Sequence, residues 1–164
     1  CTFFSLIKGK KISKNLFVKL NQATTFWHEK EQFLSHNSEL KFIDPNKKMI
    51  KEINSARLII HTFCSTGHLE CLAINRPTLI LFIHNLNLLN EKSKGYLKKF
   101  IELGIVHKTP ESLYNTLKSL DSNENIEKWW NLKKRQNLLK KYRKDFGFFN
   151  EKKVSNLKDI ISEV

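Results

Sequence analysis

The sequence predicts an α/β fold: a Rossmann-like parallel sheet flanked by helices, with additional helices at the carboxyl end. Short apolar runs, each too brief for a helix, alternate with stretches whose apolar residues recur at helical spacing. The segment 55–82 shows this most clearly, because the runs Leu58–Ile60 and Thr78–Phe82 enclose a polar turn and the helical stretch His68–Ile74. That order is a βαβ unit, which requires parallel strands.

Elements before this unit alternate in the same way. Leu16–Leu20 and Leu40–Ile43 read as strands, and Pro45 stops the second because it has no N–H to donate to a ladder. The predicted helices are a partial one at Thr2–Ile7, one over Trp27–Leu34 and a short one over Lys47–Asn54 with an apolar stripe.

After the unit, Thr109, Pro110 and Glu111 form a helix start, since Thr can cap, Pro fits the first turn and Glu favours the helix dipole. The remaining order predicts helices on both faces of one parallel sheet. The elements are a helix over about Glu91–Leu103 ended by Gly104, a strand Ile105–His107, a helix to about Leu120, a loop Asp121–Asn125, a long helix Ile126–Phe146 and a last helix Val154–Val164.

Length and composition indicate one domain. With 164 residues and 40% apolar content, we expect a single Rossmann-like domain over 1–164 whose carboxyl-terminal helices occupy 125–164. The chain begins with Cys1 and no strand precedes its first helix, so we expect a fragment of a longer two-domain protein. No apolar run approaches the roughly 18 residues of a membrane span. Cys1, Cys64 and Cys71 form no disulfide framework, which favours the reducing cytoplasm.

The charge predicts an anionic partner. The formal net charge of +13 suits a nucleotide, a polyanionic glycan, an anionic lipid or a nucleic acid. The long helix Ile126–Phe146 is basic opposite an apolar face, and three interpretations compete: a solvated face, contact with an anionic membrane, and nucleic-acid binding. No known nucleic-acid-binding module is recognisable, so we expect no nucleic acid. The apolar positions are Trp129, Leu132, Leu139, Tyr142 and Phe146, and the basic ones are Lys128, Lys133, Lys134, Arg135, Lys140, Lys141, Arg143 and Lys144.

Ser65, Thr66 and Gly67 follow the first strand of the βαβ unit and open its helix. In parallel sheets ligands bind beyond the carboxyl ends of the strands, and a helix N-terminus offers free N–H groups and a partial positive charge. The backbone N–H groups of Thr66, Gly67 and His68 therefore suit a phosphate, and Glu70 suits the hydroxyls of a ribose. The alternative is that Ser65 or Thr66 only caps the helix and Glu70 only favours its dipole.

Other polar residues belong to the same predicted sheet edge. Lys19 closes the strand Leu16–Leu20, where it could neutralise a phosphate or be one surface lysine among many. His61 directly precedes the polar turn 62–67 and Thr62 begins it, and both are further candidates for substrate contact. By location, His61 and His68 are also candidates for a catalytic base.

The same stretch contains residue types that bind metals or act as nucleophiles. His61, Cys64, His68 and Cys71 are zinc-ligand types at close spacing, yet structural zinc sites usually come from knuckles and loops. Cys71 is better interpreted as a small core residue. Cys64 at a strand-to-helix turn suggests a nucleophile elbow, but the flanking glycines of that motif are missing. We expect no metal and no cofactor.

A resemblance to a known family covers most of the chain. The carboxyl-terminal, donor-binding half of GT-B glycosyltransferases is similar to residues 56–80, Ala-Arg-Leu-Ile-Ile-His-Thr-Phe-Cys-Ser-Thr-Gly-His-Leu-Glu-Cys-Leu-Ala-Ile-Asn-Arg-Pro-Thr-Leu-Ile. More closely, the chain resembles a family of bacterial transferases linked to surface-polysaccharide assembly. Asn15–Leu20, Leu103–Ser112 and Trp129–Asn131 match that family in the same order.

The resemblance implies a sugar nucleotide whose phosphates meet Ser65, Thr66 and Gly67, with Glu70 toward ribose or sugar hydroxyls. It also implies a separate amino-terminal Rossmann-like half that supplies the acceptor site and often the catalytic base. Where an Arg is expected after the first strand, this chain has Lys19, which keeps the charge but loses the bidentate fork.

Two functional hypotheses result. The first is the donor-binding half of a bacterial glycosyltransferase, which moves a sugar from a nucleotide sugar to a surface-glycan or lipid-linked acceptor without a required metal and is expected to be inactive without its other half. Its expected location is the cytoplasm, with peripheral contact to the inner membrane as an option. The alternative is a non-catalytic Rossmann-like module that binds an anionic partner or membrane surface through its basic helix.

Overall fold

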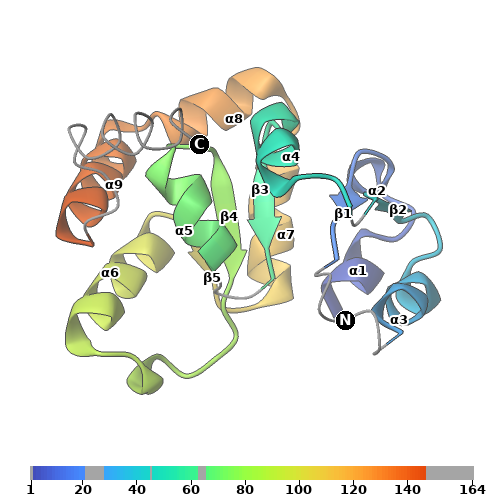
Figure 1. Cartoon of the computed structure of the whole chain (residues 1–164), viewed down its shortest axis with the longest axis horizontal. Helices are drawn as coiled ribbons and strands as arrows, with labels where there is room; N and C mark the ends of the chain where they lie inside the picture. The colour runs from blue at the N-terminus through green and yellow to red at the C-terminus, as the bar shows by residue number, and fades with distance from the viewer. Residues whose placement is uncertain (1, 21–27, 45, 63–65, 147–164) are drawn as a thin grey trace, which may run out of the picture.

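The computed structural model describes residues 2–20, 28–44, 46–62 and 66–146 and confirms the predicted α/β fold. Its strands are all parallel and form two sheets (Figure 1). In the larger sheet the strand order is β3-β4-β5, and in the smaller one β1 pairs with β2. The strands are β1 (Phe17–Val18), β2 (Lys41–Phe42), β3 (Ile59–His61), β4 (Thr78–Leu81) and β5 (Val106–His107).

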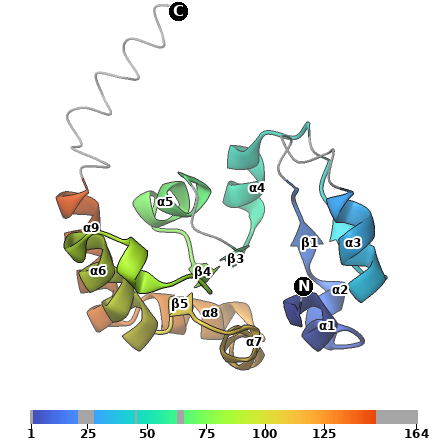
Figure 2. The ribbon, with the colours of Figure 1, turned by 90° about the horizontal axis from the view of Figure 1, so that it is seen from below.

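Helices lie on both sides of the larger sheet. Figure 2 shows α5 on one side and α7 and α8 on the other, and α1 packs against α7. The helices are α1 (Thr2–Ile7), α2 (Lys11–Lys14), α3 (Glu29–His36), α4 (Met49–Ser55), α5 (Thr66–Ala73), the 3-10 turn η2 (Leu86–Leu88), α6 (Glu91–Glu102), α7 (Pro110–Ser119), α8 (Asn123–Trp130) and α9 (Lys133–Asp145).

The central strand β4 divides the core in two. All its residues are buried, as expected of a strand covered on both faces. Because side chains alternate along a strand, Leu79 and Leu81 belong to the cluster that contains α1 and α7, whereas Ile80 and Phe82 belong to the cluster that contains α6 and α9. The register pairs Ile80 with Val106. The strand that is buried on both faces, β4, is thus the one at the centre of the sheet.

The ends of several helices follow from their capping residues. The side chain of Thr109 accepts a hydrogen bond from the Ser112 N–H, and Pro110 occupies the first turn of α7, as predicted. Gly104 follows α6 with a φ of 69°, a left-handed conformation that favours glycine. These local signals place the start of α7 and the end of α6 close to where the sequence predicts them.

The structure corrects four details of the prediction. The strands form two sheets rather than one, and the short elements α2 and η2 were not expected. The predicted loop Asp121–Asn125 already contains the start of α8, because Ser122 caps the Asn125 N–H. The predicted helix Ile126–Phe146 is two helices, α8 and α9. The predicted helix Val154–Val164 lies outside the described residues.

Side-chain hydrogen bonds accompany the break between α8 and α9. Leu132 has the extended backbone angles φ −54° and ψ 125°, and its neighbour Asn131 ends α8. The side chain of Gln136 donates to the Trp130 carbonyl at 2.8 Å and so satisfies one end of α8. The Trp130 indole N–H donates to the Asn75 carbonyl at 3.0 Å, beyond the end of α5. The break lets α8 and α9 each reach a different part of the domain.

Arginines of α9 bind the carboxyl ends of two other helices. Arg135 Nη2 and Nε donate to the Leu103 carbonyl, which ends α6, at 2.6 and 3.3 Å. Arg143 Nη1 donates to the Leu72 carbonyl in the last turn of α5 at 3.4 Å. A helix carries partial negative charge at its carboxyl end, so both guanidiniums lie where a cation is stabilising.

Candidate functional site

The parallel strands bring several polar residues to one edge of the larger sheet. We call this the carboxyl edge and define it as the residues at and just past the ends of β3, β4 and β5, namely His61–Thr62, Phe82–His84 and His107–Lys108. In Figure 1 the arrows of these strands run toward the same end of the molecule. An open parallel sheet binds its ligands beyond this edge.

Helix α5 starts beside the carboxyl edge. It begins at Thr66, so Thr66, Gly67 and His68 form its first turn, as the sequence predicts. The first N–H groups of an α-helix have no partner within the helix and carry partial positive charge. The arrangement is therefore suited to an anion. Ser65, predicted to share in this site, lies outside the described residues.

Glu70 lies on the solvent-exposed face of α5. Thr66 and Glu70 are both exposed, whereas Cys71 and Leu72 are buried and face the protein. Residues four apart are neighbours on one helix face, so the carboxylate of Glu70 stands one turn beyond the hydroxyl of Thr66. The two residues can therefore contact the same ligand. Their role in binding stays a prediction.

His61 ends β3 in a partly buried position. Its ring lies edge-on to that of His68, with centroids 6.1 Å apart, and its Nε2 is 3.5 Å from the Cys71 sulfur. Burial, and then the charge of His68, lower the pKa of His61 from 6.5 to about 4. His61 is therefore neutral at neutral pH. It can donate or accept a hydrogen bond with a ligand, but it adds no positive charge for a phosphate.

Cys71 behaves as a core residue, as the sequence suggests. It is fully buried, and burial raises the pKa of its thiol to about 11. Within the described ranges, no group of three or more His, Cys, Asp or Glu side chains is arranged to hold a metal ion. Cys64, which completes the zinc hypothesis and carries the nucleophile-elbow hypothesis, lies outside those ranges.

Lys19 follows β1 and contacts the connection between β2 and α4. Its ammonium donates to the Lys47 carbonyl at 2.8 Å and to the Asp44 carbonyl at 3.3 Å. These bonds hold Lys19 beside the smaller sheet, at the carboxyl end of β1. Lys19 lies at a strand end, as predicted, but β1 belongs to the smaller sheet whereas α5 follows β3 of the larger one, so the two do not share one sheet edge. Its contact with a phosphate stays a prediction.

His107 at the carboxyl edge and Ser112 in the first turn of α7 are polar residues that were not singled out from the sequence. His107 is only 3% exposed. Its Nε2 lies 3.2 Å from the Gly104 carbonyl, which can only accept, so Nε2 carries the proton. Nδ1 therefore accepts a 2.9 Å hydrogen bond from the Ser112 hydroxyl. The Thr-Pro-Glu helix start could have indicated this pair, because a residue in the first turn of α7 must lie near the end of β5.

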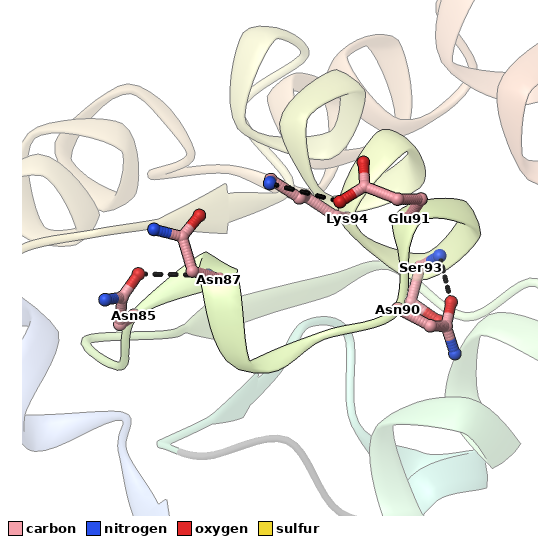
Figure 3. Close-up of polar contacts among 6 residues, drawn as sticks. All are labelled: Asn85, Asn87, Asn90, Glu91, Ser93 and Lys94. Carbon is pink, nitrogen blue, oxygen red and sulfur yellow. Dashed lines mark hydrogen bonds and ion pairs between the residues drawn. The ribbon is translucent and has the colours of Figure 1, made fainter.

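Lys108 joins the ends of β4 and β5. Its ammonium donates to the His84 carbonyl and lies 5.0 Å from the centroid of the Phe82 ring. The chain then continues through two asparagine caps, shown in Figure 3: Asn85 accepts from the Asn87 N–H, and Asn90 accepts from the Ser93 N–H, both at 2.9 Å. These bonds define the path of the chain from β4 into α6.

Comparison with protein families identifies the chain as a transferase. The matching family model is that of the LIC12162 family transferases, and it covers residues 1–161. The chain therefore belongs to this family. No curated protein and no solved structure gives a significant match. Among the helices of the described residues, none is long and apolar enough to cross a bilayer.

Proposed function

We propose that this transferase moves a glycosyl group and that the present domain binds the nucleotide-sugar donor, as the donor-binding half of a GT-B glycosyltransferase. The acceptor would be a surface glycan or a lipid-linked intermediate. The observation that carries the proposal is the start of α5 at Thr66, just past the parallel strand β3, with Glu70 exposed one turn further along. Membership of a transferase family supports a group-transfer reaction.

In this proposal the first turn of α5 binds the phosphates of the donor. The N–H groups of Thr66, Gly67 and His68 would donate to phosphate oxygens, and the positive end of the helix would stabilise the negative charge that grows on the leaving nucleoside diphosphate. Fixed backbone dipoles supply this stabilisation without a metal ion. The hydroxyl of Thr66, and those of Thr62 and Ser65 earlier in the sequence, would add further donors.

Three side chains have different roles. The Glu70 carboxylate would accept the hydroxyls of the ribose or of the sugar, a pairing that orients the donor. Lys19 would contribute one positive charge, provided it exchanges a carbonyl partner for a phosphate oxygen. His61, neutral at pH 7, would hydrogen-bond the donor without adding charge. The catalytic base would come from a second, amino-terminal half.

Calorimetric titration of the full-length protein with UDP-, GDP- and CMP-sugars tests the proposal. We expect saturable binding of one nucleotide class, weakened at least about tenfold by Glu70→Gln and by Thr66→Val, since each removes one polar contact of a bound ligand. Glu102→Gln, at an exposed carboxylate near the end of α6, is the matched control and should bind normally. Absence of binding to every nucleotide sugar, or equal losses in the control, contradicts the proposal.

A further inference from the structure

The outer face of α9 is a row of lysines. Seven residues of this helix are exposed, and five of them are lysines, whereas Leu139 and Tyr142 are buried in the core. We call these five the α9 lysine surface: Lys133, Lys134, Lys140, Lys141 and Lys144. Lys133, Lys140 and Lys144 recur at helical spacing, and Lys134 and Lys141 each follow one of them directly, so the positive charges are collected along one side of the helix.

The arginines of α9 do not contribute to this surface. Arg135 is 4% exposed, donates to the Leu103 carbonyl and lies 4.2 Å from the centroid of the Trp129 ring. Arg143 is partly buried and donates to the Leu72 carbonyl. The cations that α9 exposes to solvent are therefore lysine ammoniums, which act as point charges, while the planar guanidinium groups are used inside the domain.

A single carboxylate accompanies these lysines on α9. Asp145 accepts a 2.5 Å hydrogen bond from the Tyr96 hydroxyl, and this bond, together with the charges of Lys92, Lys141 and Lys144, lowers its pKa. Lys92, from α6, also donates to the Asp145 backbone carbonyl at 2.8 Å. One negative charge among several ammoniums leaves the surface strongly positive.

The surface also carries a shallow, open hollow. An open hollow of about 420 Å³ is lined by Asn137, Lys140, Lys141, Lys144 and Asp145. At the amino end of α9, the exposed apolar side chain of Leu132 stands beside Lys133 and Lys134, with 49% of its surface accessible. Lysines next to an exposed leucine suit the boundary between lipid headgroups and acyl chains.

We propose that the α9 lysine surface docks this domain on a membrane that contains anionic phospholipids. The ammoniums would pair with headgroup phosphates, and Leu132 would enter the acyl boundary. Clustered lysines attract such a surface without requiring oriented hydrogen bonds. A nucleic acid is the less favoured partner, because its recognition draws on arginine forks that here point inward. The proposal is independent of the donor site, because no residue is shared between the two.

Co-sedimentation of the full-length protein with phosphatidylcholine vesicles, with or without phosphatidylglycerol, tests this docking in the absence of any nucleotide sugar. We expect binding only to the anionic vesicles, weakened by high salt because surface charges are screened. The triple variant Lys140→Glu, Lys141→Glu, Lys144→Glu should bind at least about 100-fold more weakly. Leu132→Ser should weaken the part of the binding that persists in high salt.

The matched control reverses three exposed lysines elsewhere, Lys47→Glu, Lys48→Glu and Lys51→Glu, with the same change in net charge. It should retain most of the vesicle binding, and circular dichroism should show both triple variants folded. Equal losses in the two variants would reduce the effect to net charge and overturn the proposal. It is also overturned if the protein ignores anionic vesicles, or if duplex DNA binds the same lysines and phosphatidylglycerol vesicles do not displace it.

Discussion

The His107 ring and the Ser112 hydroxyl are joined across the end of β5 by a 2.9 Å hydrogen bond in which the hydroxyl donates. The direction of this bond follows from the other side of the ring, where Nε2 donates to the Gly104 carbonyl. A buried imidazole with both nitrogens satisfied fixes the end of α6, the end of β5 and the first turn of α7 relative to one another.

Removing the hydroxyl should leave the buried Nδ1 without a partner. We expect Ser112→Ala to lower the free energy of unfolding by ~1–2 kcal/mol, and Ser112→Thr, which keeps a hydroxyl, to lower it less. Urea denaturation measures both. Ser119→Ala, at an exposed serine of the same helix, is the control and should change stability by no more than about 0.5 kcal/mol. If Ser112→Ala leaves the free energy of unfolding unchanged, the hydrogen bond contributes nothing to stability.

Acid should destabilise the fold through His61. Its folded-state pKa, about 4, lies below the unfolded value of 6.5, so the unfolded chain binds more protons between these values. The stability contribution of neutral His61 is full above pH 6.5 and is lost as pH falls toward 4. We expect a loss of up to ~3 kcal/mol from this residue, measured by urea denaturation across that range.

The variant His61→Gln isolates this contribution, because glutamine keeps a polar group but does not titrate. Its stability should fall less steeply between pH 6.5 and 4 than that of the wild type, with a residual slope from His107, whose pKa is also lowered by burial. The same substitution at the exposed His36 is the matched control for the loss of an imidazole. Identical slopes for His61→Gln and the wild type would refute the assignment.

Arg135 should contribute to stability more through its shape than through its charge. We expect Arg135→Ala to cost ~2–4 kcal/mol, because it leaves the Leu103 carbonyl unpaired and removes the contact with Trp129. Arg135→Lys should recover only part of this, since an ammonium cannot reproduce the planar two-donor geometry. Thermal unfolding measures both, with the exposed Lys134→Ala as control. Full recovery by lysine would show that charge alone matters.

The Cys71 thiol should be unreactive in the folded protein. It is fully buried and its pKa is raised to about 11, so the nucleophilic thiolate is scarce at neutral pH. In the variant Cys1→Ser, Cys64→Ser, a thiol reagent should label Cys71 only at the rate of unfolding, and quickly in urea. Rapid labelling of the native protein would contradict the burial of this residue.

The elements that the sequence predicts best are those with strong local signals. The apolar run Thr78–Phe82 corresponds to β4, and the Thr109-Pro110-Glu111 start places α7 at Pro110. The break at Leu132 escapes prediction, because the apolar spacing of Trp129, Leu139 and Tyr142 continues across it. Two of the hydrogen bonds around the break reach residues distant in sequence, Asn75 and Leu103.

In the candidate site, too, the features with a local signal are predicted and those that depend on tertiary contacts are not. That Thr66 opens a helix after a strand follows from a local pattern, and so does the position of Glu70 on the same helix face. The partners of Lys19 are backbone carbonyls of a separate connection, and side-chain identities carry no signal for such bonds. The neutral state of His61 depends on its burial and on His68 seven residues later, which only the folded arrangement brings together.

The indole of Trp130 and the guanidinium of Arg143 hold α5 at the end opposite Thr66. A helix of 8 residues is about 12 Å long and stiff. Bonds that position the carboxyl end of α5 therefore also position its amino end at Thr66. Truncating the chain before Asn123 would remove both bonds and leave the Asn75 and Leu72 carbonyls without these partners. Any minimal version of this domain must therefore retain α8 and α9, even though neither helix touches the carboxyl edge through a bond described above.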